Sequence, residues 1–496
     1  MRPSSPTATP PTPAPGPPAP GPAPGPAAAS APGPGGGSPV PGRVTVVEPG
    51  MLRRAVTAAA LGNAMEWFDF GVYSYLAVTL GKVFFPAADG TAQLLAAFAT
   101  FAAAFLVRPL GGLVFGPLGD RLGRQKVLAA TMIMMAAGTF AIGLIPSYAT
   151  IGIWAPVLLL LARMVQGFST GGEYGGATTF IAEYAPDRRR GFLGSWLEFG
   201  TLVGYVAGAG LVTVMTALLD ERSLLSWGWR LPFLVAGPLG LIGLYLRMRL
   251  EETPAFRELS DRDGAADRAG APARPGGGLR ELVTTHRRAL ALCVALVLAY
   301  NVTDYLLLSY LPTYLSTELG FDATHGLLVV VAAMVLMMAV NGPLGLLSDR
   351  IGRRPVLMAG CLGFLVLSVP ALLLIRRGAY PAVLLGVGGL CLLLACFTAT
   401  MPASLPALFP THIRYRAMSV GFNVSVSLFG GTTPLAVTYL IGATGDRMVP
   451  AYYLMAAAAV GVVAVLLMPE SAGRPLPGSP PAVASEREAR HLADAG

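Results

Sequence analysis

The stretch Gly116-Pro-Leu-Gly-Asp-Arg-Leu-Gly-Arg-Gln-Lys-Val127 decides the fold, because it recurs as Gly345-Leu-Leu-Ser-Asp-Arg-Ile-Gly-Arg-Arg-Pro-Val356. Seven of the twelve positions are identical. Each copy joins two long apolar segments, so the repeat marks two equivalent halves of the chain. Many membrane transporters use paired halves to build a site that opens alternately to either side of the bilayer. The repeat therefore favours a secondary transporter.

The composition also indicates a membrane protein. Of the 496 residues, 54% are hydrophobic and only 12% are charged, about half the charged fraction of a soluble domain. The net charge of +8 is spread along the chain, which argues against a nucleic-acid partner. The cysteines lie in apolar stretches without metal-ligand spacing, and no catalytic triad, phosphate loop or zinc motif occurs. We therefore expect neither an enzyme, nor a cofactor, nor a metal.

Twelve apolar stretches are long enough to cross about 30 Å of hydrocarbon as helices. Their total predicts an all-α membrane protein with two pseudo-symmetric halves of six helices each. The alternate loops that include both repeat copies hold 20 Lys and Arg, against 6 in the opposite loops, so the first set and both termini are expected in the cytoplasm. The stretches are 55–82, 93–118, 127–146, 152–182, 191–219, 231–248, 289–316, 325–347, 355–375, 380–409, 417–440 and 451–468.

Composition also divides the chain into segments. The first 42 residues hold 16 of the 43 prolines and cannot bury enough apolar surface to fold. We expect a disordered cytoplasmic tail at 1–45, without the features of a secretory signal. The two halves follow at 46–250 and 289–469, separated by a cytoplasmic linker at 251–288. A short polar cytoplasmic tail is expected at 470–496.

Charged residues inside the bilayer are costly and are usually functional. In the first stretch Glu66, Asp69 and Tyr73 fall on one face of a helix. We interpret Glu66 and Asp69 as proton-coupling carboxylates, and Trp67 and Tyr73 as rings facing a cationic nitrogen. Structural ion pairs to another helix are the alternative.

The fourth stretch holds a second polar face. Arg163 lies near Gln166, Thr170 and Tyr174, with Glu173 to one side. We interpret Arg163 and Tyr174 as substrate-binding residues and Glu173 as a further proton-coupling candidate; a fixed salt bridge is the alternative for Arg163. The glycines at 171, 172, 175 and 176 let a neighbouring helix come close, which could be a matter of packing alone.

A third polar cluster lies in the seventh stretch. Asn301 and Tyr305, with Asp304 and Tyr310 nearby, correspond by the repeat to the first stretch, so Asn301 and Tyr305 are further candidates for substrate binding. Arg108 and Glu198 are isolated charges that could simply neutralise one another. The four histidines lie in loops, at span edges or in the tail, so a mid-membrane proton relay must use carboxylates.

The repeat loops themselves are gating candidates. Acid and base at the end of a helix can pair across an interface and interact with helix dipoles. We therefore expect the loops to hold the cytoplasmic ends of neighbouring helices together while the protein is open to the outside. The residues concerned are Asp120, Arg121 and Arg124 in the first copy and Asp349, Arg350 and Arg353 in the second.

The repeat loops resemble the signature of the major facilitator superfamily. Gly62-Asn-Ala-Met-Glu-Trp-Phe-Asp-Phe-Gly-Val-Tyr73 and Gln166-Gly-Phe-Ser-Thr-Gly-Gly-Glu-Tyr174 resemble its metabolite:proton symporter family, as do Trp227-Gly-Trp-Arg-Leu-Pro-Phe233 and Phe409-Pro-Thr-His-Ile-Arg-Tyr415. Within it, residues 44–475 are most similar to the osmoprotectant transporters for proline and betaine. From this resemblance we expect tyrosine at position 304 and aspartate at position 198, whereas this chain has Asp304 and Glu198. The chain also ends without the charged coiled coil linked to osmotic tuning in the family's best-known member.

The resemblance implies a symporter in the bacterial inner membrane that imports proline, glycine betaine, ectoine or related zwitterions with a proton by alternating access, activated by high osmolality. The expected partners are thus a small zwitterion, a proton and the lipid bilayer. An organic-acid symporter for compounds like 2-oxoglutarate, citrate or shikimate is the second hypothesis, and it requires more basic residues around the substrate. A non-transporting osmosensor on the same fold is a third hypothesis, which the absence of a signalling domain disfavours.

Overall fold

The computed structural model describes residues 44–47, 49–122, 124–248 and 279–494. Most of the expected tail at 1–45 and of the linker at 251–288 lies outside these residues. Within the described part, long helices dominate, as required for a chain that must satisfy its backbone hydrogen bonds inside lipid. The fold class predicted from the sequence is confirmed.

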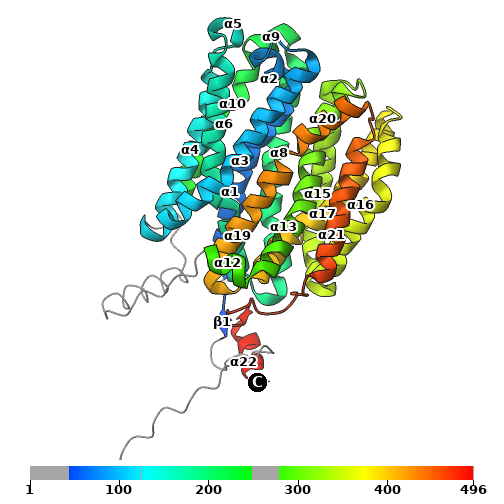
Figure 1. The fold of residues 1–496 in the computed structure, drawn as a ribbon. Coiled ribbons are helices and arrows are strands. Elements are labelled where there is room, and N and C mark those ends of the chain that lie inside the picture. The colour runs from blue at the N-terminus through cyan, green and yellow to red at the C-terminus, as the bar shows by residue number, and fades with distance from the viewer. Residues whose placement is uncertain (1–43, 48, 123, 249–278, 495–496) are drawn as a thin grey trace, which may run out of the picture. The chain divides into compact units, whose positions relative to one another are not determined.

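Helices occupy all six apolar stretches that the sequence predicts in the first half, with short helices between them (Figure 1). The fourth is not one continuous helix, because a 3₁₀ turn at Thr170–Gly172 separates α6 from α7. Its elements are β1 (Thr45–Val46), α1 (Pro49–Tyr75), α2 (Ala77–Phe84), α3 (Gly90–Leu122), α4 (Arg124–Leu144), α5 (Tyr148–Ile151), α6 (Trp154–Ser169), η1 (Thr170–Gly172), α7 (Glu173–Tyr184), η2 (Asp187–Arg189), α8 (Arg190–Leu218), α9 (Glu221–Ser226), η3 (Gly228–Arg230) and α10 (Leu231–Met248).

The second half repeats this plan. Its first and fifth segments contain π-helical turns, η4 and η6, a feature that is often found at functional sites. Its elements are α12 (Leu279–Thr285), α13 (Arg287–Asp304), η4 (Tyr305–Tyr310), α14 (Leu311–Thr317), α15 (Ala323–Ile351), α16 (Arg353–Ile375), α17 (Tyr380–Thr398), α18 (Met401–Ser404), η5 (Pro406–Leu408), α19 (Thr411–Ser425), η6 (Val426–Gly430), α20 (Thr433–Thr444), α21 (Val449–Leu467), β2 (Ala482–Val483) and α22 (Glu486–Asp494).

Among the described residues, eight helical runs are long and apolar enough to span a bilayer. The other four expected segments are helical too, each with a local reason for falling short. In α1, Asn63, Glu66 and Asp69 lower the hydropathy, and in the fourth segment Arg163 and Gln166 do the same. The apolar parts that the structure describes in α4 and in η3–α10, Ala129–Leu144 and Gly228–Ile242, are shorter.

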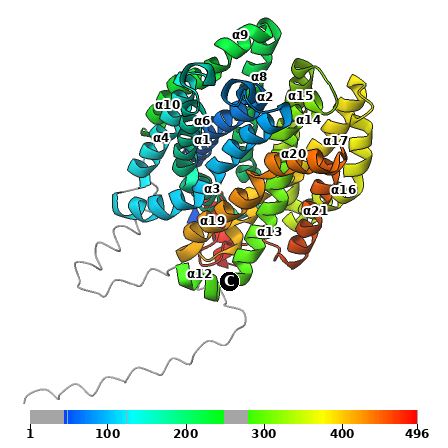
Figure 2. The ribbon, with the colours of Figure 1, turned by 45° about the horizontal axis from the view of Figure 1, so that its top comes forward.

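The two halves lie side by side, with α1 to α10 on one side and α13 to α21 on the other (Figures 1 and 2). The largest contact between them is made by α8 with α15, and α3 also packs against α19 and α20. Inside the first half, glycines bring α3 and α6 together. A Cβ atom on Gly167 would overlap the carbonyl oxygen of Ala104, and one on Gly111 would overlap that of Phe168. The site described below is held between these closely packed helices.

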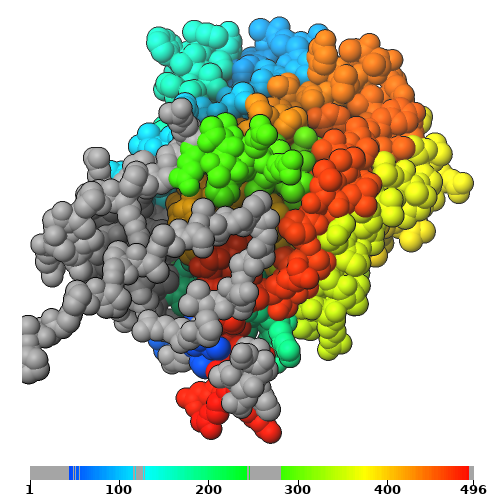
Figure 3. Space-filling model, turned by 60° about the horizontal axis from the view of Figure 1, so that its bottom comes forward, coloured from blue at the N-terminus to red at the C-terminus, as the bar shows by residue number. Residues whose placement is uncertain are grey.

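The expected polar tail, described between residues 470 and 494, packs against distant parts of the chain. Ala482 and Val483 form a parallel pair with Thr45 and Val46, and in Figure 3 the C-terminal residues, in red, lie beside these N-terminal ones, in dark blue. Glu470 accepts hydrogen bonds from the backbone N–H groups of Arg353 and Arg354 at the start of α16. Burial raises the pKa of Glu470, but bonds from four backbone N–H groups outweigh burial and lower it.

Candidate substrate and proton site

A chain of hydrogen bonds connects an acid in α1 to an arginine in α6. The Thr139 hydroxyl donates to Asp69 Oδ2 at 2.6 Å and accepts from Gln166 Nε2 at 2.5 Å. Arg163 Nη1 in turn donates to Gln166 Oε1 at 2.8 Å. All four side chains are buried. Asp69 is therefore linked to the arginine through two neutral groups, Thr139 and Gln166.

Arg163 lies in a cage of aromatic rings. Its guanidinium carbon is 4.2 Å from the centre of the Tyr73 ring and 5.2 Å from those of Phe70 and Phe101. Two of its nitrogens, Nε and Nη2, have no hydrogen-bond partner among the described residues. They form one edge of the planar guanidinium group, the edge that takes up both oxygens of a carboxylate. Arg163 is thus a buried cation with unused donors.

An aromatic cluster from both halves lies beside this cage. The ring centre of Trp67 is 5.6 Å from that of Tyr305, and the Tyr305 ring lies edge-on to Phe105 at 5.2 Å. Tyr305 belongs to η4, so the second half contributes to the same site. Its hydroxyl has no partner among the described residues. Ring faces of this kind attract a cationic nitrogen.

A buried ion pair lies next to the aromatic cluster. Arg108 Nη2 is 2.8 Å from Glu66 Oε1, and both side chains are almost fully buried. The suggestion that Arg108 and Glu198 neutralise each other is therefore wrong, and Glu66 forms an ion pair to another helix, which was the alternative to a proton-coupling role. The sequence could not show that α3 places Arg108 against α1, whereas Asp69, one turn further on, faces α4 and α6.

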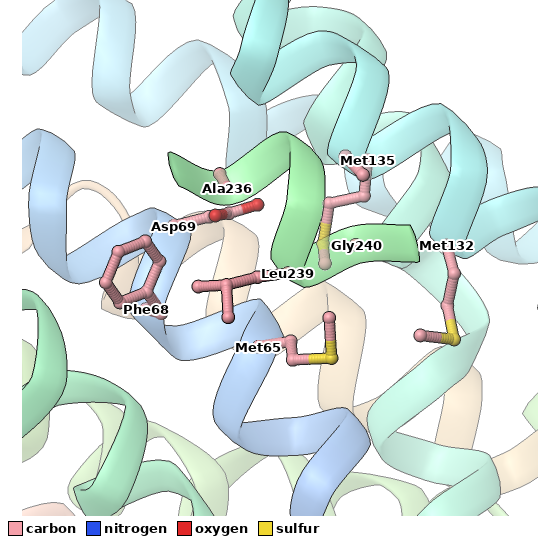
Figure 4. Close-up of a pocket in the computed structure, with 9 residues that line it drawn as sticks. Met65, Phe68, Asp69, Met132, Met135, Ala236, Leu239 and Gly240 are labelled. Carbon is pink, nitrogen blue, oxygen red and sulfur yellow. The ribbon is translucent and has the colours of Figure 1, made fainter. Parts of the chain in front are cut away.

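Asp69 also borders a small pocket between α1, α4 and α10 (Figure 4). The rest of its lining is apolar and includes the methionines Met65, Met132 and Met135. Asp69 is the one charged residue in this lining. An ionised carboxylate beside such apolar groups is costly inside a membrane, so the surroundings of Asp69 suit a group that exchanges a proton.

Three of the expected site residues lie away from Arg163. The Tyr174 hydroxyl donates to Glu198 Oε1 at 2.5 Å, and its ring stacks on Phe422 of the second half. Glu173 accepts from Thr131 of α4 at 2.9 Å. The Asn301 amide donates to Val297 of its own helix. The 3₁₀ turn η1 changes the helical register between α6 and α7. A continuous α-helix counted from Arg163 therefore predicted the wrong position for Tyr174.

The second repeat loop connects the two halves at the end of α15. Asp349 accepts hydrogen bonds from the backbone N–H groups of Gly191, at 2.7 Å, and Phe192, at 2.9 Å, at the start of α8. Arg353 lies 3.7 Å from Asp349 and also donates to Ser471, whereas Arg350 is exposed. The side chains of Asp120, Arg121 and Arg124 lie outside the part of the structure that is described.

Sequence reasoning missed several contributors to the site. Thr139 and the rings of Phe70, Phe101 and Phe105 are ordinary residues of membrane helices, and only the packing of α1, α3 and α4 shows their role. The same holds for Ser427, whose hydroxyl donates to the Phe105 carbonyl across the two halves at 2.5 Å. Arg163 and Asp69 were found because charge is rare inside a membrane.

Comparison with known proteins agrees with this architecture. The chain matches the family described as sugar (and other) transporter over residues 55–275 and 274–480. It is 52% identical to the proline/betaine transporter of Salmonella typhimurium over 451 residues, which cover 91% of this chain and 90% of that protein. It is 53% identical to the glycine betaine/proline/ectoine/pipecolic acid transporter OusA of Dickeya dadantii, covering 90% and 89% of the two chains.

A solved structure shows a similar fold. The proton:xylose symporter XylE of the major facilitator superfamily, bound to a bromodeoxyglucose, superposes with a TM-score of 0.69 over 86% of this chain and 98% of that one. The two sequences are 19% identical. The arrangement of helices is therefore shared.

Proposed function

Since this chain belongs to the sugar (and other) transporter family of the major facilitator superfamily and is a multi-pass membrane transporter, we propose that it is a proton-coupled symporter for zwitterionic osmoprotectants such as proline, glycine betaine and ectoine. The names of its relatives support this substrate class. The positive-inside count supports a cytoplasmic location of both termini, and the bacterial origin of these relatives supports placement in a bacterial inner membrane.

The observation that carries the proposal is the unused edge of Arg163. Nε and Nη2 are buried without a partner in the described part of the chain, and such donors are costly unless a ligand takes them up. A substrate carboxylate would bind this edge in two parallel hydrogen bonds. The cationic nitrogen of the same molecule would face Trp67 and Tyr305. One cation and one aromatic surface match a zwitterion.

The chain of hydrogen bonds between Asp69 and Arg163 supports proton coupling. Ionised Asp69 accepts the Thr139 hydroxyl, which orients Gln166 toward Arg163. Protonation removes the negative charge that balances Arg163, so the arginine becomes a stronger partner for a substrate carboxylate. Proton and substrate thereby favour each other's binding, and by linkage the effect is reciprocal. Glu66 is engaged by Arg108 and is the weaker candidate for the proton.

The charge balance separates the candidate substrates. A zwitterion with one proton carries one positive charge inward, which gains about 2.3 kcal/mol per 100 mV of membrane potential. At about 1.4 kcal/mol per decade this supports roughly 50-fold accumulation. A dicarboxylate with one proton would be driven outward. Because the Arg108 charge is already balanced by Glu66, the site offers one free cation in the described region once Asp69 is protonated, which suits the zwitterion.

Uptake of radiolabelled betaine, proline and 2-oxoglutarate into proteoliposomes tests the substrate class. We expect betaine and proline to enter and to compete with each other, and 2-oxoglutarate to do neither. Preferential uptake of 2-oxoglutarate would replace the proposal with an organic-acid symporter. Binding of betaine without uptake, by folded protein that is correctly inserted in the membrane, would instead favour the osmosensor.

A further inference from the structure

A second acidic pair lies at the interface of the two halves, formed by Glu198 on α8 and Asp304 at the end of α13. Both side chains are buried, with exposed fractions of 0% and 1%. Neither has an arginine, lysine or histidine partner in the described part of the chain. The pair is therefore unlike Glu66 and Asp69, each of which has a buried arginine nearby.

Glu198 is surrounded by hydroxyl groups from both halves. Tyr174 donates to Oε1, and Tyr300 and Thr201 donate to Oε2 at 2.8 Å and 3.0 Å. A carboxylate that accepts several hydrogen bonds is stabilised in its charged form. Tyr300 comes from the second half, so part of this stabilisation depends on the halves being in contact.

Asp304 has the opposite surroundings. It lies one helical turn after Tyr300 and on the same face of α13, and it interacts electrostatically with Glu198. Its Oδ1 atom has no hydrogen-bond partner among the described residues. The other titratable groups that face Asp304 are neutral ones on α13 itself and on surrounding elements: Tyr75, Tyr174, Tyr205, Tyr300, Tyr305 and Cys391.

Two adjacent carboxylates without a cation cannot both stay charged in a membrane interior. Of the two, Glu198 has the donors and Asp304 does not. We infer that Asp304 is a second proton-binding residue, which holds a proton while the halves are in contact and releases it to water when they part. On release the Asp304 carboxyl loses its proton and becomes a carboxylate, and water takes up the proton. The inference uses the alternating access of the proposed function but not its substrate.

Infrared spectroscopy of the full-length protein in proteoliposomes tests the proton directly. We expect a carbonyl band of a protonated carboxyl group at neutral pH that Asp304→Asn removes. The matched control Asp322→Asn changes an exposed residue at the start of α15 and should leave the band in place. A band that Asp304→Asn leaves at its full wild-type strength, or a wild-type protein without one, would overturn the inference.

The pH profile of solute exchange gives a second test, with whichever solute the wild type transports. If exchange requires one bound proton, the rate of exchange should fall about tenfold for each pH unit above the pKa of the group that holds the proton. Asp304→Asn resembles the protonated acid and should abolish this decline. Glu198→Gln removes the charge that favours the proton on Asp304 and should move the decline to lower pH.

At alkaline pH, Asp304→Asn should therefore raise exchange above that of the wild type and Glu198→Gln should lower it. Two residues with only a structural role would not give these opposite effects. If Glu198→Gln abolishes the decline instead, the proton resides on Glu198 and the assignment to Asp304 is wrong. If the infrared band behaves as expected but a proton gradient does not drive betaine uptake, the proposed function fails while this inference stands.

Discussion

Replacing Arg163 with lysine tests the binding edge without removing the positive charge. The wild-type guanidinium bonds Gln166 through Nη1 and keeps Nε and Nη2 unused. A lysine ammonium has no planar edge, so it can replace only one of the two hydrogen bonds that we assign to the substrate carboxylate.

The size of the effect follows from the lost bond. A hydrogen bond to a charged group contributes about 1.5 to 3 kcal/mol. At about 1.4 kcal/mol per decade, Arg163→Lys should weaken betaine and proline binding by roughly 10- to 150-fold. Both substrates should be affected alike, because they share the carboxylate that we place on this edge.

The assay is concentration-dependent exchange of each solute in proteoliposomes, corrected for the amount of inserted protein. Arg230→Lys is a matched control, since Arg230 also lies over an aromatic ring, that of Trp229 at 4.4 Å, but outside the site. The control should keep wild-type affinity. If Arg163→Lys keeps both affinities within about twofold, a difference of only about 0.4 kcal/mol, Arg163 does not bind the carboxylate and the reasoning fails.

Three further predictions concern coupling, packing and gating. Asp69→Asn should abolish accumulation driven by a proton gradient while exchange continues, and accumulation by this variant would place the proton elsewhere. Glu66→Gln leaves the Arg108 charge buried without its partner, which should destabilise the protein by about 3 to 5 kcal/mol. Thermal unfolding should show that the double variant Glu66→Gln/Arg108→Gln recovers part of this lost stability. Asp349→Asn weakens the bonds to the start of α8 by about 1 kcal/mol, and Asp120→Asn is expected to act alike in the first copy. Both should lower transport more than expression, and wild-type uptake would refute the gating role.

Much of the fold could be predicted because it depends on local chemistry. Lipid requires long apolar helices, and the duplicated loop at 116–127 and 345–356 shows that the chain consists of two similar halves. The sequence also singled out Arg163, Asp69 and Glu66, because charged residues inside a membrane are few.

The pairing of these charges could not be predicted in the same way. Glu66 and Asp69 are three residues apart on one helix, yet one meets Arg108 of α3 and the other Thr139 of α4. Which neighbour each acid meets depends on the angles between helices, which a single sequence does not encode locally. The 3₁₀ turn at Thr170–Gly172 likewise displaced Tyr174 from the face expected from helical spacing. The C-terminal segment is ordered through bonds to distant residues, such as that of Arg190 to the Arg474 carbonyl.

The most direct test of the account is the charge that accompanies each molecule of substrate. Betaine uptake and proton entry should be measured together in proteoliposomes whose membrane potential is set by a potassium gradient. We predict that proton and betaine enter together and that an interior-negative potential of about 100 mV alone supports roughly 50-fold accumulation. Betaine accumulation that is independent of the potential and unaffected by a protonophore would contradict the account.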